Sequence, residues 1–60
     1  MNILEIKVEQ KRKLYLLLDI AHNNKEENFI LTKAISSTKA EMDKEDVAYV
    51  EKEIERIYGK

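Results

Sequence analysis

The sequence predicts an all-α fold, a small three-helix bundle with a long first helix and two shorter ones. Proline is absent, and the single glycine, Gly59, is next to last, where it can end a helix. Lys, Glu, Leu, Ile and Ala, which favour or accept helix, occupy most positions. Apolar residues also recur at helical spacing along three successive segments. These observations predict one helical domain over residues 1–60.

The first predicted helix, Ile3–His22, contains an almost unbroken apolar run from Leu14 to Ala21. Successive residues turn about 100° around a helix axis, so the run places apolar side chains on nearly the whole circumference. Asn23 and Asn24 follow as a stop signal for the helix. Such a helix has to be surrounded, and a chain of 60 residues offers little material for that. We therefore expect a second copy of the chain to help cover it.

A β-hairpin is the alternative for this segment, because apolar and charged residues partly alternate from Ile3 to Glu9. The returning strand would be Leu14–Leu18. The turn between the strands, residues 10–13, would lack Gly, Asn, Asp and Pro, the residues that tolerate turn dihedrals. We expect one long helix, with the hairpin as the alternative.

The second predicted helix, Lys25–Thr38, begins after Asn24, whose side chain can cap it. Glu26 and Glu27 fall in its first turn, where the helix dipole favours acidic residues. Its last residues, 36–38, are Ser, Ser and Thr, which weaken a helix interior by competing for backbone hydrogen bonds.

The third predicted helix, Lys44–Tyr58, has the clearest pattern, a narrow apolar seam with charged residues, Glu53 among them, on the solvated face. Two capping boxes precede it, one starting at Thr38 and one at Asp43. If the second and third segments formed one straight helix, this seam and the apolar stripe of the second segment would face opposite directions. We therefore expect a break between the two segments, which lets both face one core. The predicted core is Leu4, Val8, Leu14, Leu17, Leu18, Ala21, Ile30, Leu31, Ala34, Ile35, Val47, Val50, Ile54 and Ile57.

Composition argues against several classes of function. There is no cysteine, so neither a disulfide nor a thiolate metal site can form. The one histidine, His22, is expected to interact with the carbonyls at its helix end, and we expect no catalytic site, no cofactor and no metal. Charged residues interrupt the N-terminal segment, so it does not resemble a signal peptide, and no apolar run is long enough for a membrane span. We expect a cytoplasmic protein.

These features predict a non-catalytic protein–protein interaction module, a small regulator or inhibitor that docks on a larger protein and forms a helical homodimer. The expected partner or dimer interface residues are Leu16, Ile20, Phe29 and Tyr49. The first two lie beside the buried face of the first helix, and tyrosine is enriched in interface hot spots. The Ile-, Lys-, Glu- and Asn-rich composition is typical of AT-rich bacterial or phage genes.

A dimeric nucleic-acid-binding helical protein is the alternative function. Its phosphate contacts would be the basic residues of the first helix, Lys7, Lys11, Arg12 and Lys13. Against this, the net charge is -1 and no aromatic residue is interleaved with the cluster. Nucleic acid is therefore the less favoured partner.

Overall fold

The computed structural model describes residues 2–24 and 28–59. Within them the chain forms three α-helices, α1 (Ile3–Asn23), α2 (Phe29–Ala40) and α3 (Lys44–Tyr58). No residue of the described part is in a β-strand. The predicted all-α, three-helix fold is therefore confirmed, and the first segment is a helix rather than a hairpin. The third helix has the predicted bounds.

Asparagine side chains cap the first two helices. The Asn2 side-chain oxygen accepts a hydrogen bond from the Glu5 amide at 2.9 Å, and that of Asn28 accepts one from the Leu31 amide at 3.1 Å. The prediction that Asn24 caps the second helix is wrong, because Asn24 is the C-cap of α1 and Asn28 caps α2. Residues 25–27, where Glu26 and Glu27 were expected to form the first turn, lie outside the described residues.

The junction between α2 and α3 lies at residues 41–43, after α2 has continued two residues beyond the predicted end at Thr38. Thr38 does not begin a capping box, since it is buried inside α2 and its hydroxyl donates to the Ala34 carbonyl at 2.8 Å. Asp43 is the N-cap of α3 but makes no capping hydrogen bond with its side chain. The predicted break between the two apolar stripes is confirmed.

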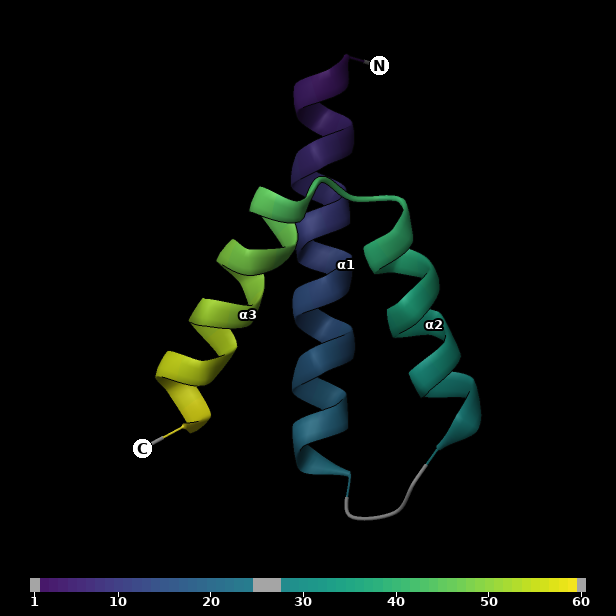
Figure 1. Ribbon diagram of the computed structural model, residues 1–60, viewed down its shortest axis with the longest axis vertical. Coiled ribbons are helices and arrows are strands. Elements are labelled where there is room, and N and C mark those ends of the chain that lie inside the picture. The colour runs from purple at the N-terminus through teal and green to yellow at the C-terminus, as the bar shows by residue number, and fades with distance from the viewer. Residues whose placement is uncertain (1, 25–27, 60) are drawn as a thin grey trace.

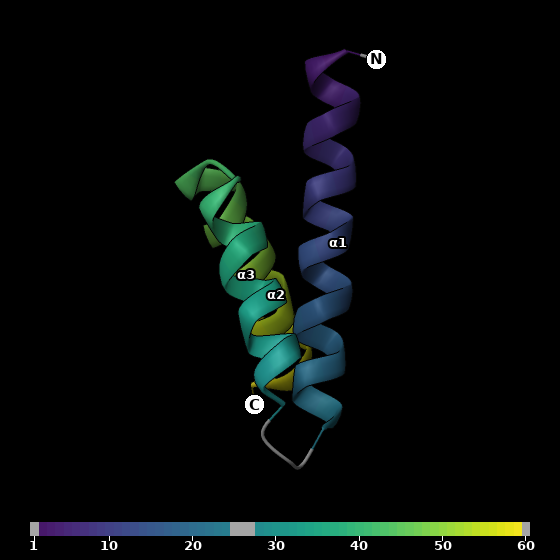
Figure 2. The same ribbon diagram turned by 90° about the vertical axis from the view of Figure 1, so that its right-hand side faces the viewer.

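The helices form two layers. α1 packs against both α2 and α3, which diverge from their connection like the arms of an inverted V (Figure 1). Turned by 90°, the molecule shows α2 and α3 on the same side of α1 (Figure 2). The shortest extent of the chain is 16 Å, which suits two layers of helices packed at about 8–10 Å. The side of α1 opposite α2 and α3 is therefore uncovered.

The core lies where the three helices meet. Leu14 of α1 is completely buried against Met42 and Val50, and Ile54 and Thr38 are also buried. Three of the predicted core residues are therefore buried, and Met42, in the connection between α2 and α3, is a core residue that the helical stripes do not identify. The predicted core residues that are half-buried are Leu17, Leu18, Ala21, Leu31, Ala34, Ile35 and Val47.

Four predicted core residues are exposed, so the prediction is wrong for them. Leu4 and Val8 lie in the first turns of α1, which extend beyond α2 and α3 (Figure 2). Ile30 in the first turn of α2 and Ile57 in the last turn of α3 are exposed at the ends where these two helices diverge (Figure 1). Helical spacing identifies the apolar stripe, but the length over which another helix covers it depends on the tertiary arrangement.

Candidate docking surface

The uncovered side of α1 carries two large apolar side chains one turn apart. Leu16 is 59% exposed and Ile20 is 52% exposed, whereas Leu14 of the same helix is completely buried. Both were expected at an interface, and Figure 2 shows that α2 and α3 lie on one side of α1 only. α2 and α3 both pack on the Leu14 side of α1, and Leu16 faces α3 only across an open groove.

A groove between α1 and α3 is lined by both Leu16 and Tyr49, which are 33 residues apart in the sequence. Its volume is about 330 Å³, and its walls are largely apolar. Tyr49 is 60% exposed, so its ring is accessible from solvent. We call this hollow the docking groove; it is lined by Lys11, Arg12, Tyr15, Leu16, Tyr49, Val50 and Glu53.

Charged side chains of opposite sign form the rims of the docking groove. The ammonium of Lys11 lies 5.5 Å from the centre of the Tyr49 ring, within the range of a cation–π contact. On the α3 side, Glu53 accepts a hydrogen bond from Arg56 at 2.8 Å, which raises the pKa of the guanidinium. Glu53 was expected on the solvated face of its helix; it instead lines the groove, with its side chain one-third exposed.

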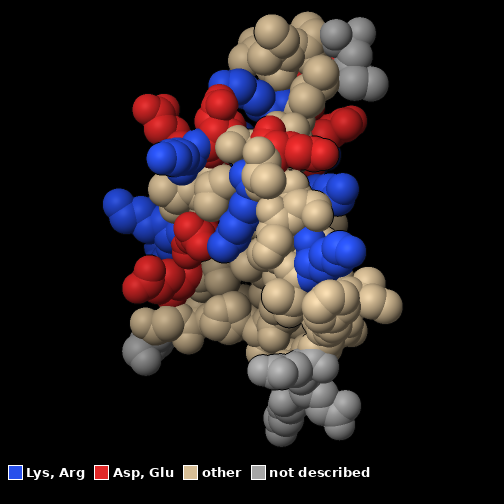
Figure 3. All heavy atoms as spheres, turned by 45° about the vertical axis from the view of Figure 1, so that its right-hand side comes forward, with Lys and Arg blue, Asp and Glu red and all other residues tan. Residues whose placement is uncertain are grey.

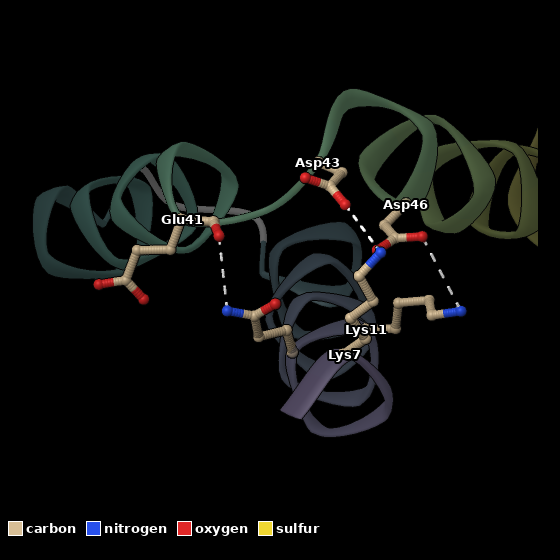
Figure 4. Close-up of polar contacts among 6 residues, drawn as sticks. Lys7, Lys11, Glu41, Asp43 and Asp46 are labelled. Carbon is tan, nitrogen blue, oxygen red and sulfur yellow. Dashed lines mark hydrogen bonds and ion pairs between the residues drawn. The ribbon is translucent and has the colours of Figure 1, made fainter. Parts of the chain in front are cut away.

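The basic cluster of α1 is divided by the fold. Lys7 forms an ion pair with Asp43 at 2.9 Å, and Lys11 approaches Asp46 at 4.0 Å (Figure 4). The hydrogen bond to Asp43, together with the charges of Asp43 and Asp46, raises the pKa of Lys7. Acidic residues at the start of α3, where the helix dipole favours them, thus lie beside two of the four predicted phosphate contacts.

The other two basic residues of the cluster, Arg12 and Lys13, are exposed on α1 and make no ion pair with the residues that the structure describes. In the face drawn in Figure 3, Lys and Arg side chains are interspersed with Asp and Glu rather than gathered in one basic patch. That face therefore carries no single continuous basic patch.

Phe29, the fourth predicted interface residue, does not line the docking groove. It is the first residue of α2 and is 79% exposed. The structure therefore brings Leu16 and Tyr49 together, places Ile20 one turn further along α1, and leaves Phe29 on a different element.

A polar contact that the sequence patterns did not identify joins the ends of α1 and α3. The ring of Tyr58 stacks on His22 with centroids 4.6 Å apart and planes 11° from parallel. Its hydroxyl donates to the Asp19 carboxylate and accepts from the Asn23 side chain at 3.4 Å. The hydrogen bond to Asp19 raises the pKa of Tyr58. The only signal in the sequence is the position of both rings near helix ends, which does not predict a contact.

The structure shows no group of three metal-ligating side chains among residues 2–24 and 28–59. Within the same residues, no helix has the length and apolar character needed to cross a membrane. Comparisons with protein-family models, curated proteins and solved structures found no match to this chain. The functional interpretation therefore depends on the surface of the chain itself.

Proposed function

We propose that this chain is a non-catalytic protein–protein interaction module, a small regulator or inhibitor that docks on a larger protein. The observation that supports this most is the docking groove, where an exposed tyrosine and an exposed leucine from two helices line one apolar hollow. Cations lie on one rim and a carboxylate on the other. An apolar centre with aromatic residues, arginine and a polar rim is the usual composition of protein interfaces.

A homodimer is part of this proposal. Full burial of such a side chain is worth about 1.5–3 kcal/mol, and Leu16 and Ile20, at 59% and 52% exposure, each forgo a little over half of it in water. A single-core bundle of this size has roughly 3–5 kcal/mol to spare, so covering both residues is a large gain. A second copy would take the α1 side of the surface, while Tyr49 on α3 would contact the larger protein.

Binding to nucleic acid through Lys7, Lys11, Arg12 and Lys13 is less well supported. Two of these cations already face carboxylates at the start of α3. A phosphate would have to compete with these ion pairs for two of its contacts. Any affinity gained through the remaining cations would fall steeply with rising salt concentration.

Affinity capture from extract of the native host tests the docking proposal. The bait is the wild-type chain, the Tyr49→Ala variant or the Lys52→Gln variant, with and without nuclease treatment. Lys52 is exposed on α3 and does not line the groove. We expect the wild-type and Lys52→Gln baits to capture the same protein from the extract. The Tyr49→Ala bait should bind that protein at least about tenfold more weakly, as expected when a hot-spot residue is removed.

Two results would contradict the proposal. Capture that is equal for wild type and Tyr49→Ala would exclude this surface as the docking site. Capture that disappears on nuclease treatment, and weakens steeply with salt, would favour the nucleic-acid function instead.

A further inference from the structure

One cation of the docking groove has no counter-charge in the part of the chain that the structure describes. Arg12 lines the groove, is exposed, and forms no ion pair with residues 2–24 or 28–59. Glu9 lies three residues before it on α1, yet no ion pair joins the two. The guanidinium therefore places an unpaired positive charge at the edge of an apolar hollow.

The other charged residues of the groove already have partners. The Lys11 ammonium lies 4.0 Å from an oxygen of Asp46 and 5.5 Å from the centre of the Tyr49 ring. On the opposite wall, the carboxylate of Glu53 accepts a hydrogen bond from Arg56 at 2.8 Å. A protein that docks in the groove therefore meets one charge that is still available, and its sign is positive.

We propose that the larger protein docks through an acidic, apolar peptide segment. One apolar side chain of the segment enters the groove between Leu16 and Tyr49, and a neighbouring carboxylate pairs with Arg12. The inference rests on the docking function proposed above and names the chemistry of the segment that binds there.

The spacing of Arg12 and Leu16 supports an acid next to an apolar anchor. The two residues are four positions apart on α1, so they lie about 6 Å apart along the helix axis and about 40° apart around it. A short segment can therefore contact both at once. Arginine suits a carboxylate partner, because its planar guanidinium can donate two parallel hydrogen bonds and is more weakly hydrated than an ammonium.

The shape of the groove favours a protein segment over a small molecule. Pockets for small ligands bury roughly 70–90% of the ligand surface. Leu16 and Tyr49, on the two walls, are 59% and 60% exposed, so this hollow is open to solvent. Its volume of about 330 Å³ is at the lower end of the range for such pockets. A side chain carried by a larger partner can fill it, while the rest of the partner covers the rim.

Selection from a random peptide library displayed on phage tests the charge preference. The targets are wild type, Arg12→Glu and the matched control Lys13→Glu. Lys13 is also an exposed cation of α1 without an ion pair to the described residues, but it does not line the groove. We expect wild type and Lys13→Glu to enrich peptides with Asp or Glu near an apolar residue. Arg12→Glu should enrich Lys or Arg in that place.

Fluorescence anisotropy with one enriched peptide measures the contribution of the ion pair. Replacing the acidic residue of the peptide by the corresponding amide should weaken binding to wild type by about tenfold or more. The same replacement should change little for Arg12→Gln, which has already lost the charge, whereas Tyr49→Ala should weaken binding of the unaltered peptide. Circular dichroism of each variant checks that these exposed substitutions leave the helices intact.

Two results would overturn the inference while the docking function stands. One is a set of peptides that depend on Tyr49 but show no acidic preference on wild type. The other is an acidic preference that Arg12→Glu leaves unchanged. A library that yields no peptide dependent on Tyr49 would contradict the docking function as well.

Discussion

At the scale of single residues, Tyr58 shows how one side chain connects two helix ends. Its ring stacks on His22, and its hydroxyl donates to Asp19 and accepts from Asn23. The three partners belong to the last turns of α1, whereas Tyr58 is the last residue of α3. The contact therefore holds the end of α3 against α1 beyond the buried residues of the core.

The Tyr58→Phe variant tests this contact through its pH dependence. The pKa of Tyr58 is raised in the folded state, chiefly because its hydroxyl donates to Asp19. Its contribution to stability is therefore complete below the unfolded pKa of about 10 and is lost as pH rises through the higher folded pKa. We expect wild type to be more stable than Tyr58→Phe at neutral pH, with the difference narrowing above about pH 10. Urea unfolding of both chains at several pH values measures it; a difference independent of pH would contradict the assignment.

The sequence predicted buried residues that follow a helical pattern. It did not predict contacts that depend only on how the helices pack together. Leu14, Val50 and Ile54 follow from helical spacing and are buried. Met42 was missed because it lies between helices, where no periodicity operates. The His22–Tyr58 stack was missed because the two residues are 36 positions apart, and no local sequence pattern indicates such a contact.

At the scale of elements, the sequence contains two candidate capping residues for the start of α2 and two for the start of α3. Asn24 and Asn28 both precede residues able to form a helix, and only Asn28 caps α2. Thr38 and Asp43 both begin a capping-box pattern, but Thr38 is buried in α2, where its hydroxyl bonds to Ala34. The bounds of α3 were predicted because its apolar seam and Gly59 limit the helix at both ends.

Asn28→Ala tests the importance of the α2 cap. The substitution leaves the Leu31 amide without its side-chain acceptor. We expect the free energy of unfolding to fall by about 0.5–2 kcal/mol. Asn28→Ser is the matched control, because serine caps nearly as well and should retain most of the stability. Chemical denaturation of the three chains is the measurement, and equal losses in both variants would show that the side-chain bond does not stabilise α2.

At the scale of the whole molecule, the two-layer arrangement explains why α1 keeps an uncovered face. The apolar run of residues 14–21 predicted that two short helices would be unable to surround α1, and Leu16 and Ile20 are indeed exposed. The sequence did not predict that Leu4, Val8, Ile30 and Ile57 would be exposed too, since that depends on where α2 and α3 diverge. Nor did it predict that Leu16 and Tyr49 would share a groove, which requires the packing of α3 on α1.

Sedimentation equilibrium at micromolar concentration tests most directly whether the uncovered face of α1 is an interaction surface. We expect wild type to sediment with twice the 7.1 kDa mass of the single chain. Leu16→Glu should shift it to monomer, because the interface would bury an unpaired carboxylate. Lys52→Gln, which changes the net charge by the same amount at an exposed position of α3, should remain dimeric. A wild-type chain that is fully helical by circular dichroism and monomeric at this concentration would contradict the account.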